Sequence, residues 1–332
     1  MLNRFIGISI LVLSILLAWG WMQYREFLQT PLMLQQAGMR YILQPGGSVN
    51  SLAADLAARE IIRQPVMLRL LARTTDQADK LKAGEYYIPA GTTPVQLLGI
   101  LTSGKVIQHT LTLVEGWTFK QMMAAINRHE VLKHTLLELP DSEIMQRLGY
   151  PEQHPEGRFY PDTYHFPRGT SDVDYLRRAY ARMQQVLANE WEKRAPDLPL
   201  QTPYEALILA SIVERETALP QERPLIAGVF TRRLRKGMRL QTDPTVIYGM
   251  GEAYDGNIRR RDLQRDTPYN TYVRKGLTPT PIAMPSGAAI HAVLHPEPGT
   301  SLYFVATGNG GHHFSATLEE HNKAVRKYQL KR

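Results

Sequence analysis

The chain has 332 residues, of which 43% are hydrophobic and 21% charged, which is typical of a globular protein long enough for two packed domains. It contains no cysteine, and this excludes disulfide bonds and thiolate metal sites. The formal net charge of +8 favours an anionic neighbour such as acidic lipid, nucleic acid or an acidic cell-wall polymer. Because the basic residues are scattered and no helix-turn-helix, zinc-finger or aromatic RNA-binding pattern is present, we expect no nucleic-acid partner.

An apolar segment near the N-terminus is long enough to cross a membrane. The 20 residues from Phe5 to Tyr24 carry no charge. A helix of that length spans roughly 30 Å, the thickness of the hydrocarbon core, and Trp19 and Trp21 would lie at the interface. A cleaved signal peptide is the alternative, but the segment is long for one and no small-x-small cleavage site follows Trp19. We therefore expect residues 1–25 to form an uncleaved single-pass anchor.

Residues 40–105 are expected to form a small module. The pattern predicts a strand, two helices, a second strand and a third helix, at residues 41–43, 49–56, 65–73, 82–88 and 94–101. This strand–helix–helix–strand order resembles a LysM module, a domain that binds chains containing N-acetylglucosamine. The alternative is a purely structural module that positions the rest of the chain.

The remainder, residues 106–332, is expected to form a larger α+β catalytic domain, so the predicted fold class is α+β behind an N-terminal transmembrane helix. Strands are predicted at 106–114 and 302–306, and helices at 119–128, 172–192, 204–218 and 222–235. Residues 156–164 combine acids with aromatic side chains. Aromatic rings stack on the apolar faces of sugars and acids bind their hydroxyl groups, so Asp162 is a candidate substrate contact. A structural turn is the alternative.

The helix that begins at Tyr204 is the most informative element. Residues 207–213 are apolar all round the helical wheel, which is typical of a helix buried on every side. At 100° per residue, Glu216 lies about 20° from Leu209, whereas Glu214 lies about 160° from Glu216. A carboxyl on such an apolar surface is costly to ionise, so its pKa should rise, as a general acid requires. The alternative is a structural ion pair with a nearby arginine.

A polar run follows, from Leu240 to Gly249. The Asp-Pro pair favours a turn, so we expect a defined loop that presents these side chains. Short donors and acceptors beside an aromatic ring suit a ligand rich in hydroxyl groups. The candidate substrate contacts in this run are Gln241, Asp243, Thr245 and Tyr248.

These segments resemble the MltG (YceG-like) family of endolytic murein transglycosylases. The resemblance is carried by residues 210–217, 229–234, 237–249, 269–272, 276–277, 303–305 and 311–314, and it extends from about residue 40 to the end of the chain. It implies that Glu216 is the catalytic acid and that Glu214 is a structural acid or a group that steers Glu216. Tyr269, Asn270 and His312 become further candidates for contact with substrate.

The resemblance also implies the reaction. A family member cuts the β-1,4 bond between N-acetylmuramic acid and N-acetylglucosamine within newly made peptidoglycan and leaves a 1,6-anhydro end. One acid would protonate the glycosidic oxygen and then take the proton of the muramoyl C6 hydroxyl, so no second carboxylate, cofactor or metal is expected. The expected setting is the periplasmic face of a bacterial inner membrane, beside peptidoglycan synthases.

Two departures and two alternatives complete the sequence-based hypothesis. The family reads Gly-Leu-Pro-Pro-Gly-Pro-Ile where this chain has residues 276–282, and a family glycine is replaced by Ser286, so we expect a different loop shape there. A metallohydrolase would have to use the C-terminal histidines, but these lack an HExxH spacing, and residues 310–313 are expected to form a turn. The histidines are His291, His295, His312, His313 and His321. The other alternative is a membrane-anchored, non-catalytic glycan-binding scaffold of a cell-wall synthesis complex.

Overall fold

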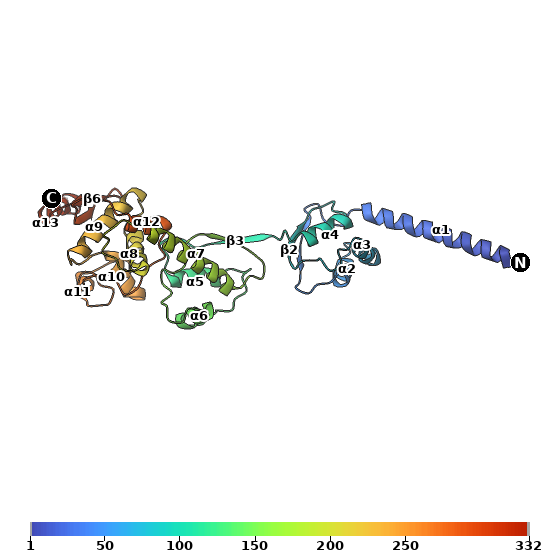
Figure 1. The fold of residues 1–332 in the computed structure, drawn as a ribbon, viewed down its shortest axis with the longest axis horizontal. Helices are drawn as coiled ribbons and strands as arrows, with labels where there is room; N and C mark the ends of the chain where they lie inside the picture. The colour runs from blue at the N-terminus through green and yellow to red at the C-terminus, as the bar shows by residue number, and fades with distance from the viewer. Residues whose placement is uncertain (1, 331–332) are drawn as a thin grey trace. The chain divides into compact units, whose positions relative to one another are not determined.

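The structure is a computed structural model that describes residues 2–330 and divides into two compact units (Figure 1). Unit 1 comprises Met1–His109 and His165–Gly169, and unit 2 comprises Thr110–Tyr164 and Thr170–Arg332. The described residues contain three two-stranded sheets among many helices. The fold is therefore a mixture of α and β structure with an apolar N-terminal helix, as the sequence predicted.

Helix α1 (Leu2–Gln29) contains the predicted apolar segment. Its stretch Arg4–Gln29 is long and apolar enough to cross a membrane, and the large apolar side chains from Phe5 to Met22 are exposed, as a lipid-facing surface would be. Near the C-terminal end of the helix, Phe27 is buried in the core of unit 1. The N-terminal part of the helix is therefore exposed and apolar, whereas its C-terminal end belongs to a folded core.

Unit 1 continues with five elements in the predicted order. They are β1 (Met39–Leu43), α2 (Val49–Ala58), α3 (Pro65–Thr74), β2 (Gly84–Ile88) and α4 (Pro94–Ser103). The two strands pair antiparallel, with Met39 opposite Ile88. Ser48 and Thr93 cap α2 and α4 through side-chain hydrogen bonds, which is why each helix begins where it does. The predicted order is confirmed, whereas the LysM-like identity stays a prediction.

A buried carboxylate explains why the short segment His165–Gly169 belongs to unit 1. Glu85 is 3% exposed, and its Oε2 lies 2.7 Å from Nε2 of His109 and 2.8 Å from Nε of Arg168. Burial acts to raise the pKa of Glu85, but the hydrogen bonds from His109 and Arg168 outweigh it and hold the pKa below its ordinary value. The segment is tied to β2 by this ion cluster.

Unit 2 is built mainly of helices. The remaining elements of the chain are β3 (Gln108–Thr112), α5 (Phe119–Asn127), α6 (Asp141–Leu148), β4 (Thr163–Pro167), α7 (Asp172–Glu192), α8 (Pro203–Glu216), η1 (Pro220–Glu222), α9 (Arg223–Arg235), α10 (Asp243–Met250), η2 (Gly251–Ala253), α11 (Arg260–Gln264), α12 (Gly287–Leu294), β5 (Tyr303–Ala306), β6 (His312–Ser315) and α13 (Leu318–Tyr328). Strand β3 pairs with β4, and β5 pairs antiparallel with β6.

Helix α8 lies at the centre of unit 2. Every residue from Ala206 to Val213 is buried, and α7, α9, α10 and α12 all pack against it. Thr202 caps its first turn, and Pro203 stands in that turn, where a missing N–H costs nothing. The prediction of a helix buried on every side is confirmed.

Two local predictions were wrong. Residues 243–250 form helix α10 and not a loop. The proline at position 244 lies in the first turn, where proline is well tolerated, and the negative charge of Asp243 lies favourably at the positive end of the helix dipole. The turn expected at residues 310–313 lies one step earlier, at 308–310, so His312 and His313 belong to strand β6.

Candidate active site

Glu216 is the last residue of α8, and its carboxyl faces the start of α10. The hydroxyl of Thr242 donates a hydrogen bond to its Oε2. Burial raises the pKa of Glu216; the hydrogen bond from Thr242 and the charges of His312 and Arg233 act in the opposite direction, and the charge of Asp243 adds to the rise. Burial dominates, so the pKa lies above its ordinary value. This is an acid that keeps its proton to a higher pH than an exposed glutamate does.

Glu214 lies in a different environment on the other side of α8. Its Oε1 accepts from Nη2 of Arg223 at 3.2 Å, and its Oε2 accepts from the backbone N–H of Ser286 at 2.9 Å and from the Ser286 hydroxyl. The side chains of Glu214 and Arg223 are 6% and 11% exposed, so this ion pair is largely desolvated. Glu214 therefore joins α8 to α9 and to the N-terminus of α12.

Ser286, one of the two departures from the family pattern, takes part in this junction. It has φ −69°, which is ordinary for any residue, and its hydroxyl caps α12 as well as bonding Glu214. A glycine at this position has no hydroxyl to donate. The serine therefore adds a hydrogen bond to the buried carboxylate.

Thr242 is itself held in place by a hydroxyl network. Its backbone N–H donates to Oγ1 of Thr271 at 3.1 Å, and Thr271 also contacts the hydroxyl of Thr245 at 2.8 Å. Thr245 is fully buried, and its hydroxyl donates to the carbonyl of Thr242 at 2.7 Å. The hydroxyl of Thr245, a candidate for contact with substrate, therefore faces the protein in this structure and positions Thr242.

Asn270 also has a structural position. It is 1% exposed, and its amide nitrogen donates to three backbone carbonyls while its oxygen accepts from the N–H of Tyr272 at 2.9 Å. The amide of Asn270, another candidate for contact with substrate, is therefore engaged by backbone groups in this structure. The side chain fixes the loop so that the hydroxyl of Tyr272 reaches Oδ1 of the exposed Asp243 at 2.6 Å.

Arg233 brings positive charge close to Glu216 without pairing with it. The guanidinium is 6% exposed and donates to the carbonyls of Leu240 at 2.7 Å and Leu302 at 2.6 Å. It also reaches Oε1 of Gln241, at 3.4 Å, whose backbone is left-handed with φ 53°. Arg233 is one of the arginines near the helix that the sequence offers as ion-pair partners for its acids; in the structure its guanidinium bonds backbone carbonyls instead.

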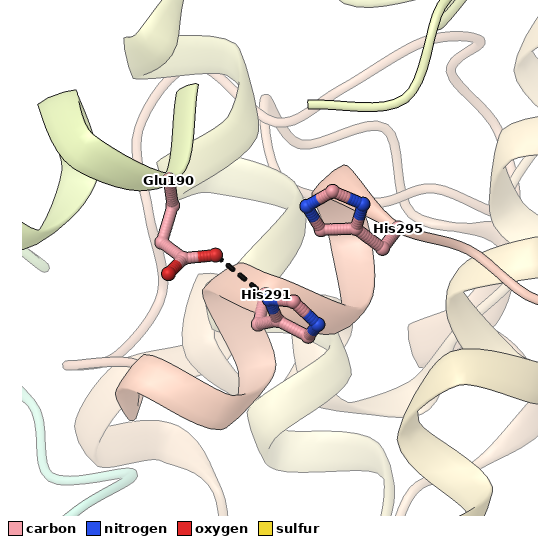
Figure 2. Close-up of side chains that lie close together, drawn as sticks. All are labelled: Glu190, His291 and His295. Atoms are coloured by element: carbon pink, nitrogen blue, oxygen red, sulfur yellow. Dashed lines mark hydrogen bonds and ion pairs between the residues drawn. The ribbon is translucent and has the colours of Figure 1, made fainter. Parts of the chain in front are cut away.

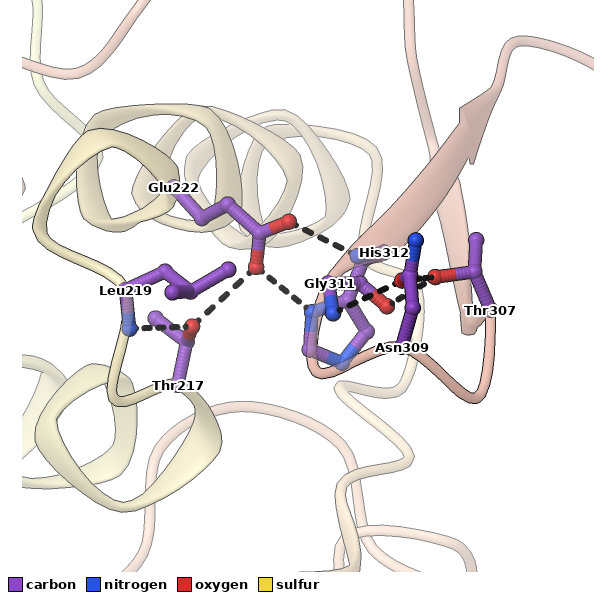
Figure 3. Close-up of polar contacts among 7 residues, drawn as sticks. All are labelled: Thr217, Leu219, Glu222, Thr307, Asn309, Gly311 and His312. Carbon is purple, nitrogen blue, oxygen red and sulfur yellow. Dashed lines mark hydrogen bonds and ion pairs between the residues drawn. The ribbon is translucent and has the colours of Figure 1, made fainter.

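His312 reaches the site through a second acid (Figure 3). Its backbone N–H donates to Oε1 of Glu222 at 2.7 Å, and its Nδ1 lies 2.8 Å from Oε2, which also accepts from the hydroxyl of Thr217 at 3.1 Å. Burial acts to raise the pKa of Glu222, but these hydrogen bonds hold it below its ordinary value. Thr217 directly follows Glu216, so the network fixes the end of α8 to β6 and keeps the imidazole of His312 close to the acid.

A pocket of about 660 Å³ lies beside α10 in unit 2. Arg215 and Pro244 line it, together with Tyr248 and Tyr269, whose rings meet edge to face with centroids 4.9 Å apart. The Tyr269 hydroxyl contacts the hydroxyl of Thr280 at 2.9 Å, in the loop 276–282 that differs from the family pattern. The pocket therefore has aromatic walls of the kind that stack on sugars; Arg215 lines it, whereas the neighbouring Glu216 is not among the residues that line it.

Glu156 closes one side of this pocket and was not among the candidates from sequence. Its Oε1 accepts from the N–H of Phe119 at the start of α5, and its Oε2 accepts from the hydroxyl of Tyr248 at 3.0 Å. Burial raises the pKa of Glu156 to about 7 despite these hydrogen bonds. The neighbouring Gly157 has φ 74°, and a Cβ there would lie 2.4 Å from Cβ of Pro281, so this position requires glycine.

The raised pKa of Glu156 predicts a pH-dependent stability. In the unfolded chain the group ionises near 4.5, so stability is fully present below that pH and is lost as the pH rises to about 7. The difference corresponds to about 3 kcal/mol. We expect Glu156→Gln to remove this loss. In urea denaturation, the free energy of unfolding of the variant should therefore rise relative to that of the wild type between pH 4.5 and 8. The exposed Glu152, changed to Gln, serves as the control, and an unchanged difference across the pH range would contradict the burial argument.

Asp162, the candidate from the aromatic cluster, has local contacts. It is exposed, its Oδ1 accepts from the N–H of Thr163 at 2.7 Å, and its carbonyl accepts from Leu113. The structure thus places it at the start of β4, whereas Glu156 of the same cluster lies in the pocket. Of the other candidates, Tyr248 and Tyr269 line the pocket. Asp243 and His312 lie close enough to Glu216 to affect its pKa, and Gln241 contacts Arg233.

Comparisons with known proteins agree on one family. A family model described as the YceG-like family matches residues 41–327. A relative from Bacillus subtilis (strain 168), named endolytic murein transglycosylase, is 31% identical over 300 residues, covering 85% of this chain and 82% of the relative. A relative of the same name from Streptococcus pneumoniae serotype 2 (strain D39) is 28% identical, covering 96% of this chain and 64% of the relative. A crystal structure of a protein from Listeria monocytogenes described as yceG-like has a TM-score of 0.55 and 29% identity, covering 87% of this chain and 99% of that one.

Proposed function

Because the chain belongs to the YceG-like family, we propose that it is a lytic transglycosylase that cleaves the β-1,4 bond between N-acetylmuramic acid and N-acetylglucosamine and leaves a 1,6-anhydro end. Glycan strands of peptidoglycan are its substrate. The observation that carries the proposal is the contrast between the two acids of α8. Glu214 forms a buried ion pair with Arg223, whereas Glu216 accepts a hydrogen bond from a hydroxyl and has a raised pKa.

In the proposed reaction Glu216 acts twice. The protonated carboxyl gives its proton to the glycosidic oxygen as the bond from that oxygen to C1 of the muramoyl residue breaks. The resulting carboxylate then takes the proton of the muramoyl C6 hydroxyl, whose oxygen forms the new bond to C1. Protons balance, the acid is regenerated, and no water enters. An internal nucleophile has a high effective concentration, which removes the need for the second carboxylate of a hydrolase.

The surroundings of Glu216 suit both steps. Hydrogen bonding from Thr242 and the charges of His312 and Arg233 stabilise the carboxylate that forms on proton donation, while burial raises the pKa of Glu216 and so favours the protonated form before the reaction. Tyr248 and Tyr269 supply ring faces and edges for the sugar, and Gln241 and Asp243 supply polar contacts at the start of α10.

The cellular setting follows the same reasoning. We propose that α1 anchors the chain in a bacterial inner membrane with both units in the periplasm, that cuts are internal in strands close to the membrane, and that peptidoglycan synthases are its neighbours. We further propose that residues 40–105 form a LysM-like module that holds glycan, with residues 106–332 as the catalytic domain.

The test of the function is product analysis on glycan strands of defined length. After incubation with the full-length protein in detergent, mass spectrometry should show fragments that are one water lighter than hydrolysis products and that take up no label from heavy-oxygen water. Labelled end products instead would show a hydrolase. Strand binding with no fragments at all would favour the scaffold alternative.

Thr242→Val should separate the role of the hydroxyl from that of the acid. The change removes the donor to Glu216 but keeps the shape of the buried side chain. Because that hydrogen bond stabilises the carboxylate formed on proton donation, we expect kcat to fall by about 10-fold or more. Its loss also raises the pKa of Glu216 further, so the basic limb of the pH–rate profile should move to higher pH. An unchanged profile would mean that Glu216 does not donate the proton.

A further inference from the structure

Three potential metal ligands from two helices meet on the surface of unit 2 (Figure 2). Glu190 lies in the last turn of α7, His291 lies in α12, and His295 is the C-cap of α12. One ligand atom from each residue lies within 4.8 Å of the others. Glu190 lies about a hundred positions before the histidines in the chain, and the packing of α7 on α12 brings it to them.

We propose that Glu190, His291 and His295 form a binding site for one divalent transition-metal ion of the zinc type. Imidazole nitrogen and carboxylate oxygen are both preferred zinc ligands, and histidines four positions apart at the end of a helix lie on the same face. The ring centroids of His291 and His295 are 4.4 Å apart, and one nitrogen of each ring lies within 4.8 Å of the other and of a Glu190 carboxylate oxygen. A water molecule would complete the tetrahedron.

The geometry requires only a small adjustment of side chains. Zinc with ligands at about 2.0–2.1 Å places adjacent ligand atoms about 3.4 Å apart. Here Oε2 of Glu190 lies 2.7 Å from Nδ1 of His291, and the widest separation in the group is below 4.8 Å. Rotation of the side chains can lengthen the Glu190–His291 distance and shorten the widest one, because His291 is 60% exposed and free to change its rotamer.

The helix termini favour a cation at this place. The backbone N–H of Ala195, just beyond α7, donates to the carbonyl of Leu294 at the end of α12, so the carboxyl ends of both helices lie close together. The negative end of a helix dipole attracts positive charge. A bound ion would therefore fasten α7 to α12, the helix whose other end holds Glu214 through Ser286. The site is structural, and it does not depend on the proposed glycan chemistry.

The test is zinc binding to the full-length, untagged protein in detergent, measured by calorimetry and by thermal unfolding. We expect one Zn²⁺ per chain in the micromolar range and a higher Tm in its presence. His291→Ala and His295→Ala should each weaken binding by about tenfold or more and abolish the rise in Tm, and Glu190→Gln should weaken binding.

Matched controls keep the site separate from general histidine binding and from catalysis. His313→Ala removes an exposed histidine of β6, Glu192→Gln removes an exposed acid of α7, and both should bind zinc as the wild type does. Glu216→Gln should also bind normally. The proposal is overturned if zinc does not bind, or if His295→Ala binds as tightly as the wild type, which would leave an ordinary ion pair between Glu190 and His291. Circular dichroism of the metal-free variants establishes that each is folded.

Discussion

Glu216→Gln is expected to abolish formation of anhydro ends while leaving the protein folded. The amide cannot donate the proton to the glycosidic oxygen or take it from the C6 hydroxyl, so the rate should fall by about 10²–10⁴-fold, the usual contribution of general acid–base catalysis. The measurement is the initial rate of anhydro-end formation on defined strands, with strand binding measured in parallel. Binding should persist, because the contacts proposed for substrate lie on other side chains.

The stability of the same variant provides the control. Since the pKa of Glu216 in the folded state lies above its unfolded value, stability is fully present at low pH and is lost as the pH rises through the folded pKa. Glutamine does not ionise, so the variant should have an equal or higher Tm than the wild type at pH 7. An inactive variant with a much lower Tm would instead indicate a structural acid, and an active variant would remove Glu216 from the mechanism.

Glu214→Ala is expected to lower the stability of the protein, in contrast to Glu216→Gln, which is expected to lower its activity. The change leaves Arg223, which is 11% exposed, without its carboxylate, and leaves the N–H and hydroxyl of Ser286 without an acceptor. Removing one partner of a buried ion pair typically costs about 3–5 kcal/mol. For a protein of this size that lowers Tm by roughly 10 °C, measurable by calorimetry.

The matched comparison is an ion pair on the surface. Glu319 and Lys323 approach to 2.9 Å on α13 with 79% and 66% of their side chains exposed, and solvent screens such a pair, so Glu319→Ala should change Tm little. A Glu214→Ala variant that is as stable as Glu319→Ala but inactive would contradict the structural role and make Glu214 part of the chemistry. Replacing both Glu214 and Arg223 by leucine and methionine should recover part of the lost stability.

Much of the local structure near the site follows from short-range patterns. The all-round apolar run from Leu207 to Val213 predicts a buried helix, and two positions of helix rotation place Glu214 and Glu216 on different sides of it. Their environments differ accordingly, with Arg223 beside one and Thr242 beside the other. Helix α10 was missed because Asp-Pro is typical both of turns and of first helical turns, and only the following packing decides between them.

The sequence by itself determined the apolar N-terminal helix, the order of elements in residues 40–105 and the buried helix that carries the acid, because each depends on the pattern of neighbouring residues. The tertiary structure decided which groups surround those elements. Thr242 reaches Glu216 from 26 positions away, and His291 reaches Glu190 from 101 positions away. The same folding buries Glu156 and both threonine hydroxyls behind Thr242. Such pairings depend on how helices pack in three dimensions, and the periodicity of one segment carries no information about its partner in another.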